Sequence, residues 1–239
     1  MAGSGGRMLK RYFFPVLALL VALAVTVYFM TGYHPHERDV REVVPVEKFT
    51  LANGLSVVVI TNERIPVVSH LLIVKAGGAD DPYGKTGLAH YLEHLMFTGT
   101  KNFPEGAYDR EVSKVGGVQN AHTTRDYTLY YATVPKEHVP AVMAMEADRL
   151  ANLEVTPAMA AREREVITEE RTLRVDNQPV HQWSEQLNAI TFLNHPYRQP
   201  VVGWAEDIAG LTATDATEFF ARYYRPSNLT LLLVGDITV

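Results

Sequence analysis

The sequence predicts an α+β fold in which a mixed β-sheet packs against a layer of helices. Apolar segments of strand length come first along the chain, longer helical segments cluster after them, and a strand returns near the end. Strands and helices segregated in this way are typical of α+β domains rather than of a regular βαβ repeat. The length of 239 residues, 47% hydrophobic and 21% charged, allows one large core or two small ones.

The expected strands are apolar runs bounded by turn residues. The first two, residues 49–51 and 55–60, flank Asn53 and Gly54, the dipeptide that most strongly indicates a β-hairpin. A third apolar run stops at an Ala-Gly-Gly sequence, which favours a turn. This strand and the later ones are expected at residues 66–75, 118–123, 127–134 and 229–234.

The expected helices are marked by apolar side chains at helical spacing. Residues 86–97 carry leucines at this spacing, Thr86 and Gly87 offer an N-cap region, and Gly99 follows the end of the segment. Further helices are expected at residues 108–115, 139–152, 157–175, 182–191 and 213–224.

The N-terminal segment departs from the globular pattern. Arg7, Lys10 and Arg11 precede residues 12–30, which carry no charge. This run approaches the ~20 residues that span a bilayer and is longer than the apolar stretch of a typical cleaved signal peptide. Residues 1–31 are therefore expected to be an uncleaved membrane anchor, with the rest of the chain on the outer, periplasmic side.

A secreted form of the protein is the alternative for this segment. Ala22, Leu23 and Ala24 form a small-x-small sequence that could be a signal cleavage site, although it lies inside the apolar run. Residues 32–45 then mix charges, histidines and prolines without a period, as a tether would. The globular domain is expected over residues 46–239.

Charge and cysteine content exclude several classes of site. The formal net charge is -5, and no basic run occurs after the first few positions, so we expect no nucleic-acid partner. The chain has no cysteine, which excludes disulfides, thiolate zinc sites and a cysteine nucleophile. Any transition metal must therefore be held by histidine and carboxylate side chains.

Three residues of the first expected helix suit a catalytic metal site. His90 and His94 are four residues apart, so both imidazoles lie on one helix face and can converge on one ion. Glu93 shares this face, and its carboxylate can reach a water at the metal without being a ligand itself. The alternative is a structural or solvent-facing histidine pair, which this spacing alone does not exclude.

A catalytic zinc site also needs a third protein ligand and an open fourth position. In the glutamate-rich helix further along the chain, Val166, Ile167 and Leu173 define the expected inward stripe. Glu163 and Glu170, seven residues apart, fall on that stripe, where an unpaired carboxylate is costly and a cation is its natural partner. Glu170 is the expected third ligand, and Glu163 an auxiliary acid/base or a group that supports the ligands.

The remaining histidines do not form a second cluster in the sequence. They lie in the tether, in a strand or far from any other candidate ligand, and structural roles are expected for all of them. They are His34, His36, His70, His122, His138, His181 and His195.

From residue 46 to its end, the sequence resembles the pitrilysin/insulinase family of zinc peptidases, the inverzincins, which also include the mitochondrial processing peptidase. The inverted motif His90-Tyr-Leu-Glu-His94 stands within the longer string GLAHYLEHLMFTGT. The distal glutamate pair of the family corresponds to Glu163 and Glu170, with Glu170 76 residues after His94. The strings GGVQNA, at residues 116–121, and His-Pro-Tyr, at 195–197, also match.

The resemblance implies a zinc-dependent endopeptidase that hydrolyses peptides or unfolded polypeptide segments. Zinc, held by His90, His94 and Glu170, and the carboxylate of Glu93 would activate a water that attacks the peptide carbonyl. The resemblance also implies that Asn120 and Ala121 line an exposed sheet edge on which the substrate lies as an added strand.

The resemblance further implies that this domain is the metal-binding half of a two-domain clamshell. A second, homologous domain or subunit is therefore an expected partner, and little activity is expected from these 239 residues alone. The main alternative is a non-catalytic scaffold subunit of the same fold, a role that exists among relatives with eroded ligands. A membrane-tethered peptide-binding module with a structural zinc is less favoured, because no fourth protein ligand is evident.

Overall fold

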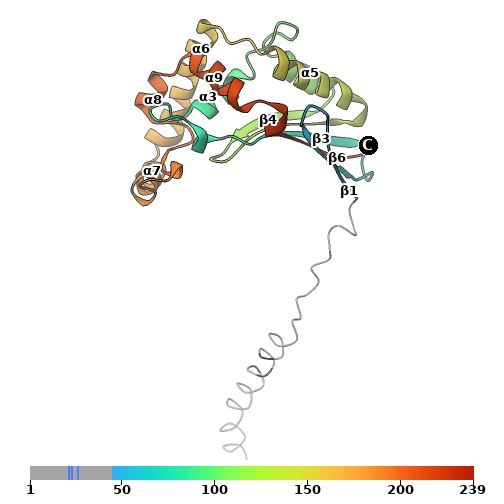
Figure 1. Cartoon of the computed structure of the whole chain (residues 1–239), viewed down its shortest axis with the longest axis horizontal. Helices are drawn as coiled ribbons and strands as arrows, with labels where there is room; N and C mark the ends of the chain where they lie inside the picture. The colour runs from blue at the N-terminus through green and yellow to red at the C-terminus, as the bar shows by residue number, and fades with distance from the viewer. Residues whose placement is uncertain (1–20, 22, 24–25, 27–44) are drawn as a thin grey trace, which may run out of the picture. The chain divides into compact units, whose positions relative to one another are not determined.

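The computed structural model describes residues 21, 23, 26 and 45–239 (Figure 1). Apart from these few positions, the expected anchor, residues 1–31, and the tether, residues 32–45, lie outside the described residues. Among the described residues, no helix has the length and apolar character needed to cross a membrane.

Six strands form one mixed sheet, in the order β1-β2-β6-β3-β5-β4. β2 and β6 run parallel, and all other neighbours are antiparallel. Among the described strands, β4 pairs with β5 alone and so forms an edge of the sheet. The bounds are β1 Val46–Thr50, β2 Ser56–Thr61, β3 Val67–Val74, β4 Val118–Thr123, β5 Thr128–Pro135 and β6 Leu229–Gly235.

One face of the sheet carries the core. Side chains along β3 and β5 alternate between buried and half-buried, the pattern of strands covered on one face. The helices gather on this covered side (Figure 1). Their bounds are α3 Leu88–Leu95, α4 Ala107–Lys114, α5 Val139–Asn152, α6 Pro157–Arg171, α7 Pro179–Thr191, α8 Ala205–Ala209 and α9 Ala213–Tyr223. The predicted α+β architecture is thus confirmed, with α8 as a helix that the sequence pattern did not reveal.

The helix α3 begins at Leu88, directly after Gly87, one of the two residues of its expected N-cap region. Gly87 precedes it with φ of 85°, a left-handed conformation that glycine adopts without steric cost. The buried carboxylate of Asp81 accepts the N–H groups of Gly87 and Ala89, each at 2.8 Å, which satisfies donors at the start of the helix. Thr86 instead donates its hydroxyl to Asp207 at 2.6 Å.

The helix expected over residues 157–175 ends earlier as an α-helix. α6 stops at Arg171, and residues Thr172–Asp176 continue as a turn of π-helix. α7 starts at Pro179, a residue suited to a first helical turn, rather than at Gln182. The wider π turn changes the helical phase after Arg171.

The inward stripe of α6 differs from the expected one. Ile167 is fully buried, but Val166 and Leu173 are 44% and 56% exposed. Leu173 lies in the π turn, where the helical phase changes. Val166 directly precedes Ile167, so its side chain points to a different side of the helix. Glu163 and Glu170 are nevertheless turned inward, because the buried stripe runs through Ala160 and Ile167.

A buried ion pair lies in the core behind the C-terminal end of α3. The Arg149 guanidinium donates to Glu146 at 2.7 Å, and both side chains are about 95% removed from solvent. The guanidinium also lies over the rings of Phe97 and Tyr130, 4.9 and 4.7 Å from their centroids. These contacts join α5 to the end of α3 and to the sheet.

Candidate active site

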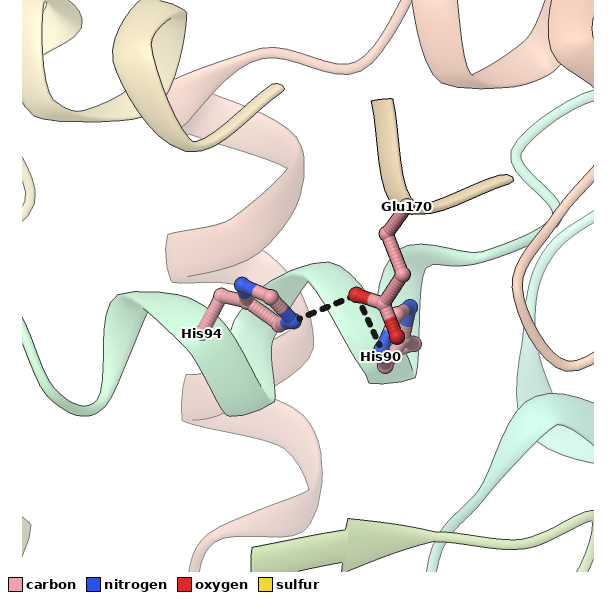
Figure 2. A group of neighbouring side chains, drawn as sticks. All are labelled: His90, His94 and Glu170. Carbon is pink, nitrogen blue, oxygen red and sulfur yellow. Dashed lines mark ion pairs between the residues drawn. The ribbon is translucent and has the colours of Figure 1, made fainter. Parts of the chain in front are cut away.

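His90 and His94 of α3 meet Glu170 of α6 in one cluster (Figure 2). One carboxylate oxygen, Glu170 Oε2, lies 3.6 Å from His90 Nε2 and 3.2 Å from His94 Nε2. The three ligand atoms lie within 4.8 Å of one another. The structure therefore brings together the three residues that the sequence predicted as metal ligands.

The geometry of this cluster fits a zinc ion. In a tetrahedral site with ligands about 2.0–2.2 Å from the metal, neighbouring ligand atoms lie about 3.3 Å apart. The two nitrogen–oxygen separations of 3.2 and 3.6 Å bracket this value. Two imidazole nitrogens and one carboxylate oxygen are also a donor set that zinc prefers in catalytic sites, with room for one more ligand.

The carboxylate of Glu93 lies beside the cluster without belonging to it. Thr123 of β4 donates its hydroxyl to Glu93 Oε2 at 2.5 Å. Burial raises the pKa of Glu93, and the hydrogen bond from Thr123 opposes this effect. A carboxylate with a raised pKa is better matched to accepting a proton near neutral pH.

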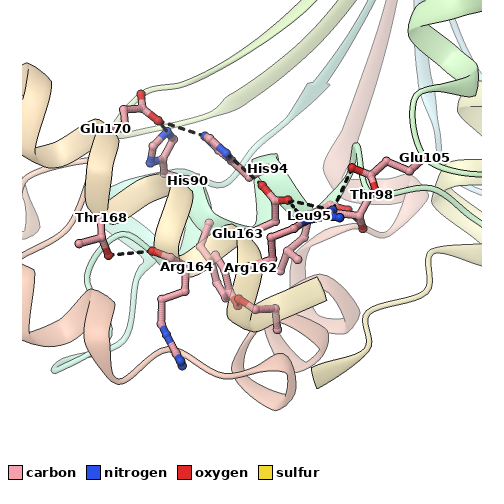
Figure 3. Close-up of polar contacts among 12 residues, drawn as sticks. His90, His94, Leu95, Thr98, Glu105, Arg162, Glu163, Arg164, Thr168 and Glu170 are labelled. Atoms are coloured by element: carbon pink, nitrogen blue, oxygen red, sulfur yellow. Dashed lines mark hydrogen bonds and ion pairs between the residues drawn. The ribbon is translucent and has the colours of Figure 1, made fainter. Parts of the chain in front are cut away.

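Glu163 contacts the opposite nitrogen of His94 (Figure 3). Its Oε2 lies 3.6 Å from His94 Nδ1, and its Oε1 lies 3.1 Å from a guanidinium nitrogen of Arg162. Burial lowers the pKa of His94, but the contacts with Glu163 and Glu170 outweigh it and raise this pKa to about 9. The environment of His94 therefore favours a positive charge.

The edge strand β4 forms one wall of the cavity beside the cluster. The cavity has a volume of about 780 Å³ and contains both predicted substrate-binding residues, Asn120 and Ala121. The N–H of Ala121 donates to Asn120 Oδ1 at 2.8 Å, so a side chain satisfies this edge amide. A smaller recess of about 280 Å³ is lined by Glu93, His94, Phe97, Thr98, Glu105, Asn120 and Glu163.

A family model described as Insulinase (Peptidase family M16) matches residues 56–204. The chain belongs to the M16 peptidase family.

Similar proteins include proteases and a respiratory-complex subunit. The zinc protease PqqE of Helicobacter pylori is 34% identical over 80% of this M16 chain and 43% of its own length. Cytochrome b-c1 complex subunit 1, mitochondrial, of Rattus norvegicus is 28% identical over 93% of this chain and 45% of its own length. The crystal structure of a protease from Helicobacter pylori matches with a TM-score of 0.79 and 33% identity, over 82% of this chain and 47% of that chain.

These comparisons confirm the resemblance and the fold, and they support a peptidase function for the M16 domain. The chain spans about half the length of the curated relatives it matches. The activity and the partners of a complete M16 protein are therefore matters of proposal for this chain.

Several residues of the M16 site were not predicted from the sequence. His122 and His181, which are isolated in the sequence, both line the large cavity, as do Arg125 and Arg174. Alternation along β4 could have placed His122 near Asn120. Arg174 stands four residues after Glu170, a helical spacing that could have placed it beside that carboxylate. The position of His181 depends on the π turn and the start of α7, which no local sequence pattern indicates.

Proposed function

We propose that the chain is the metal-binding half of a zinc-dependent endopeptidase that hydrolyses peptides or unfolded polypeptide segments. The observation that carries this proposal is the convergence of His90, His94 and Glu170 beside the carboxylate of Glu93. The family and the zinc protease among its relatives give independent support. The proposed assignments are His90, His94 and Glu170 as zinc ligands and Glu93 as the catalytic base.

In this proposal, a zinc ion in the cluster supplies Lewis-acid polarisation of the peptide carbonyl and lowers the pKa of a water molecule. Glu93 takes a proton from that water as its oxygen bonds to the carbonyl carbon. Glu93 would then give the proton to the leaving nitrogen as the C–N bond breaks, so the products are a carboxylic acid and an amine, which become a carboxylate and an ammonium by transfer of the remaining proton. Thr123 orients Glu93 for both transfers through its hydrogen bond.

We assign Glu163 to the support of His94 rather than to a proton transfer of its own. Its nearest partner in the cluster is His94 Nδ1 at 3.6 Å. A carboxylate on the second nitrogen of a ligating imidazole fixes the orientation of the ring and raises its basicity. An auxiliary acid/base role for Glu163 is the alternative proposal.

The open edge of β4 supports binding of extended peptides. A peptide added as a seventh strand would bond to backbone groups of β4, and such bonding makes little demand on sequence. Asn120 and Ala121 would contact it, and the amide of Ala121 would exchange its bond with Asn120 Oδ1 for one with the peptide. Folded proteins lack free extended segments, so peptides and unfolded segments are the favoured substrates.

We propose that a second homologous half completes the cavity. The cavity beside the cluster is open to solvent in this chain. The relatives are about twice as long as the region that they share with this chain. Peptide cleavage by the chain alone is therefore expected to be weak. Joining or adding a homologous second half is expected to increase it.

We also propose that the protein is exported and held at the outer side of a membrane by residues 1–31, with secretion after cleavage as the alternative. The uncharged run after three basic residues supports this location. Fractionation of expressing cells, with N-terminal sequencing of the mature protein, distinguishes the two outcomes. Protein recovered in the cytosol with an intact N-terminus would contradict both.

A non-catalytic scaffold subunit is the second candidate function, because one relative is a subunit of the cytochrome b-c1 complex. The deciding experiment compares peptide cleavage, with a homologous second half added, and zinc content for the chain and its Glu93→Gln variant. Peptidase function predicts that the variant keeps zinc and loses cleavage. Glu165→Gln, an exposed glutamate of α6, is the matched control and should change neither. A Glu93→Gln variant with full activity would contradict the assignment.

A further inference from the structure

Arg125 lines two adjoining cavities near the end of β4. It lies two residues beyond Thr123, the last residue of β4, and lines the large cavity of about 780 Å³. It also lines an adjoining cavity of about 210 Å³, together with residues of α7 and of the segment 198–202. A peptide lying along the edge of β4 would therefore pass Arg125 on its way out of the cavity.

The guanidinium of Arg125 has no acidic partner among the described residues. Arg149, Arg162, Arg171 and Arg174 each form an ion pair with a carboxylate, whereas Arg125 forms none. Its Nε is buried without a hydrogen-bond partner. Such a buried donor is costly unless a ligand satisfies it.

A side-chain platform holds the guanidinium in place. Its Cζ lies over the ring of Tyr197, 5.4 Å from the centroid. The Tyr197 hydroxyl donates to the carboxylate of Asp126, with its oxygen 2.7 and 2.6 Å from the two carboxylate oxygens. Asp126 is thus engaged by Tyr197, and Arg125 is positioned by stacking while its hydrogen-bonding capacity stays unused.

The other charged groups of the cavity leave this end without a negative partner. Glu93 accepts from Thr123, and Glu170 contacts the two histidines and Arg174, at 2.5 Å. Glu185, which lines the adjoining cavity with Arg125, is paired with Arg171 at 2.9 Å. An incoming carboxylate would find a partner in Arg125.

The strand register gives the position that such a carboxylate would take. The hydrogen bond between Thr123 and Glu93 marks the level of the bond to be cleaved. Arg125 lies two residues further, about 7 Å along an extended chain. Antiparallel pairing is somewhat more stable than parallel pairing, and an antiparallel peptide brings its N-terminal side to the end of β4.

We propose that Arg125 selects substrates with an aspartate or glutamate two or three residues before the cleaved bond. The inference rests on the proposed peptidase function and adds a substrate class to it. The guanidinium would form a charge-assisted, two-pronged hydrogen bond with the side-chain carboxylate. Stacking on Tyr197 would keep the guanidinium in the orientation that receives it.

The experiment measures peptide binding to the full chain with zinc added, in the Glu93→Gln background, so that no peptide is consumed. Fluorescence anisotropy compares ten-residue labelled peptides that differ only by glutamate or glutamine at one position, scanned along the peptide. The glutamate peptide is expected to bind about tenfold more tightly at one position, the range of a hydrogen bond to a charged group. A companion cleavage assay with active chain and a homologous second half locates the cleaved bond in the same peptides.

Three variants separate selection by Arg125 from general electrostatics. Arg125→Gln should abolish the preference and leave the affinity for the glutamine peptide unchanged, whereas Arg125→Lys should keep part of the preference. Arg222→Gln is the matched control, because Arg222 is exposed outside the cavity and stacks on Tyr223 at 5.3 Å. It should keep the full preference.

The outcomes distinguish this inference from the proposed function. An acidic preference that survives in Arg125→Gln, lies after the cleaved bond or is absent overturns the inference while peptide binding itself stands. If the Glu93→Gln chain with Arg125 intact binds none of the peptides, the proposed function and the inference are overturned together.

Discussion

Glu163 and Glu170, seven residues apart on α6, contact the two ring nitrogens of the same histidine. Glu163 Oε2 lies 3.6 Å from His94 Nδ1, and Glu170 Oε2 lies 3.2 Å from His94 Nε2 (Figure 3). Residues seven apart lie almost on one line along a helix, so a single helix face presents both carboxylates. α6 thus supplies a candidate ligand and the group that orients a second ligand.

The first prediction concerns Glu170. Glu170→Gln should weaken zinc binding by more than about 100-fold, because loss of a ligand costs more than the 10–100-fold typical of a supporting group. Zinc content after dialysis against a weak chelator measures this loss. Glu169→Gln is the matched control, since Glu169 is the exposed neighbour on the same helix. Stoichiometric zinc in Glu170→Gln would rule out the third-ligand assignment.

The inward placement of these glutamates could be predicted from sequence, although for partly incorrect reasons. The seven-residue spacing survives any small error in the helical phase, so Glu163 and Glu170 stay together even though Val166 and Leu173 are exposed. The shared face of His90 and His94 on α3 could be predicted for a similar reason, because it depends only on their spacing of four residues within one helix.

Features that no local periodicity marks could not be predicted in this way. Asp81 caps α3 from a loop that precedes it, and no local pattern distinguishes such a carboxylate from a solvated one. The place of β4 at the edge, beside α3, follows from the strand order, which is set by pairing between strands far apart in sequence. The π turn after Arg171, which separates α6 from α7, likewise has no local sequence pattern that indicates it.

The second prediction concerns the charge state of His94. In the metal-free chain the pKa of His94 should be near 9, and Glu163→Gln should lower it, because the carboxylate that favours the imidazolium is lost. NMR titration of the histidine rings measures both values. Zinc affinity should fall by about tenfold, the lower end of the range for groups that support a ligand. Glu165→Gln should leave the His94 titration unchanged, and an unaltered pKa in Glu163→Gln would contradict the assigned contact.

The third prediction concerns the hydrogen bond between Thr123 and Glu93. Thr123→Val removes a donor that lowers the pKa of Glu93, so this pKa should rise. A catalytic base must be ionised, and the acidic limb of the kcat/KM profile should therefore move to higher pH. Thr123→Ser keeps the donor and should restore the limb. A profile that falls in height without moving in pH would show that Thr123 has only a packing role.

The fourth prediction concerns the buried pair of Glu146 and Arg149 behind α3. Arg149→Met should destabilise the domain by about 3–5 kcal/mol, because the Glu146 carboxylate stays buried without its partner. Arg149 also stacks on Phe97 and Tyr130, so part of the loss comes from these contacts. Urea unfolding of the zinc-free chain measures the change without a contribution from metal binding.

The double variant Glu146→Leu/Arg149→Met separates the two causes. With neither charge of this pair left in the core, the domain should regain most of the lost stability, since apolar replacements of a buried ion pair are often neutral. The contact of Tyr108 with Glu146, 3.4 Å between the hydroxyl and Oε2, can persist in Arg149→Met and is lost only in the double variant, so its loss opposes the expected recovery. A double variant as unstable as Arg149→Met would instead assign the stabilisation to the stacking of Arg149 on the rings at the end of α3. In that case the position of α3, and with it the spacing of His90 and His94 from Glu170, would depend on Arg149 itself.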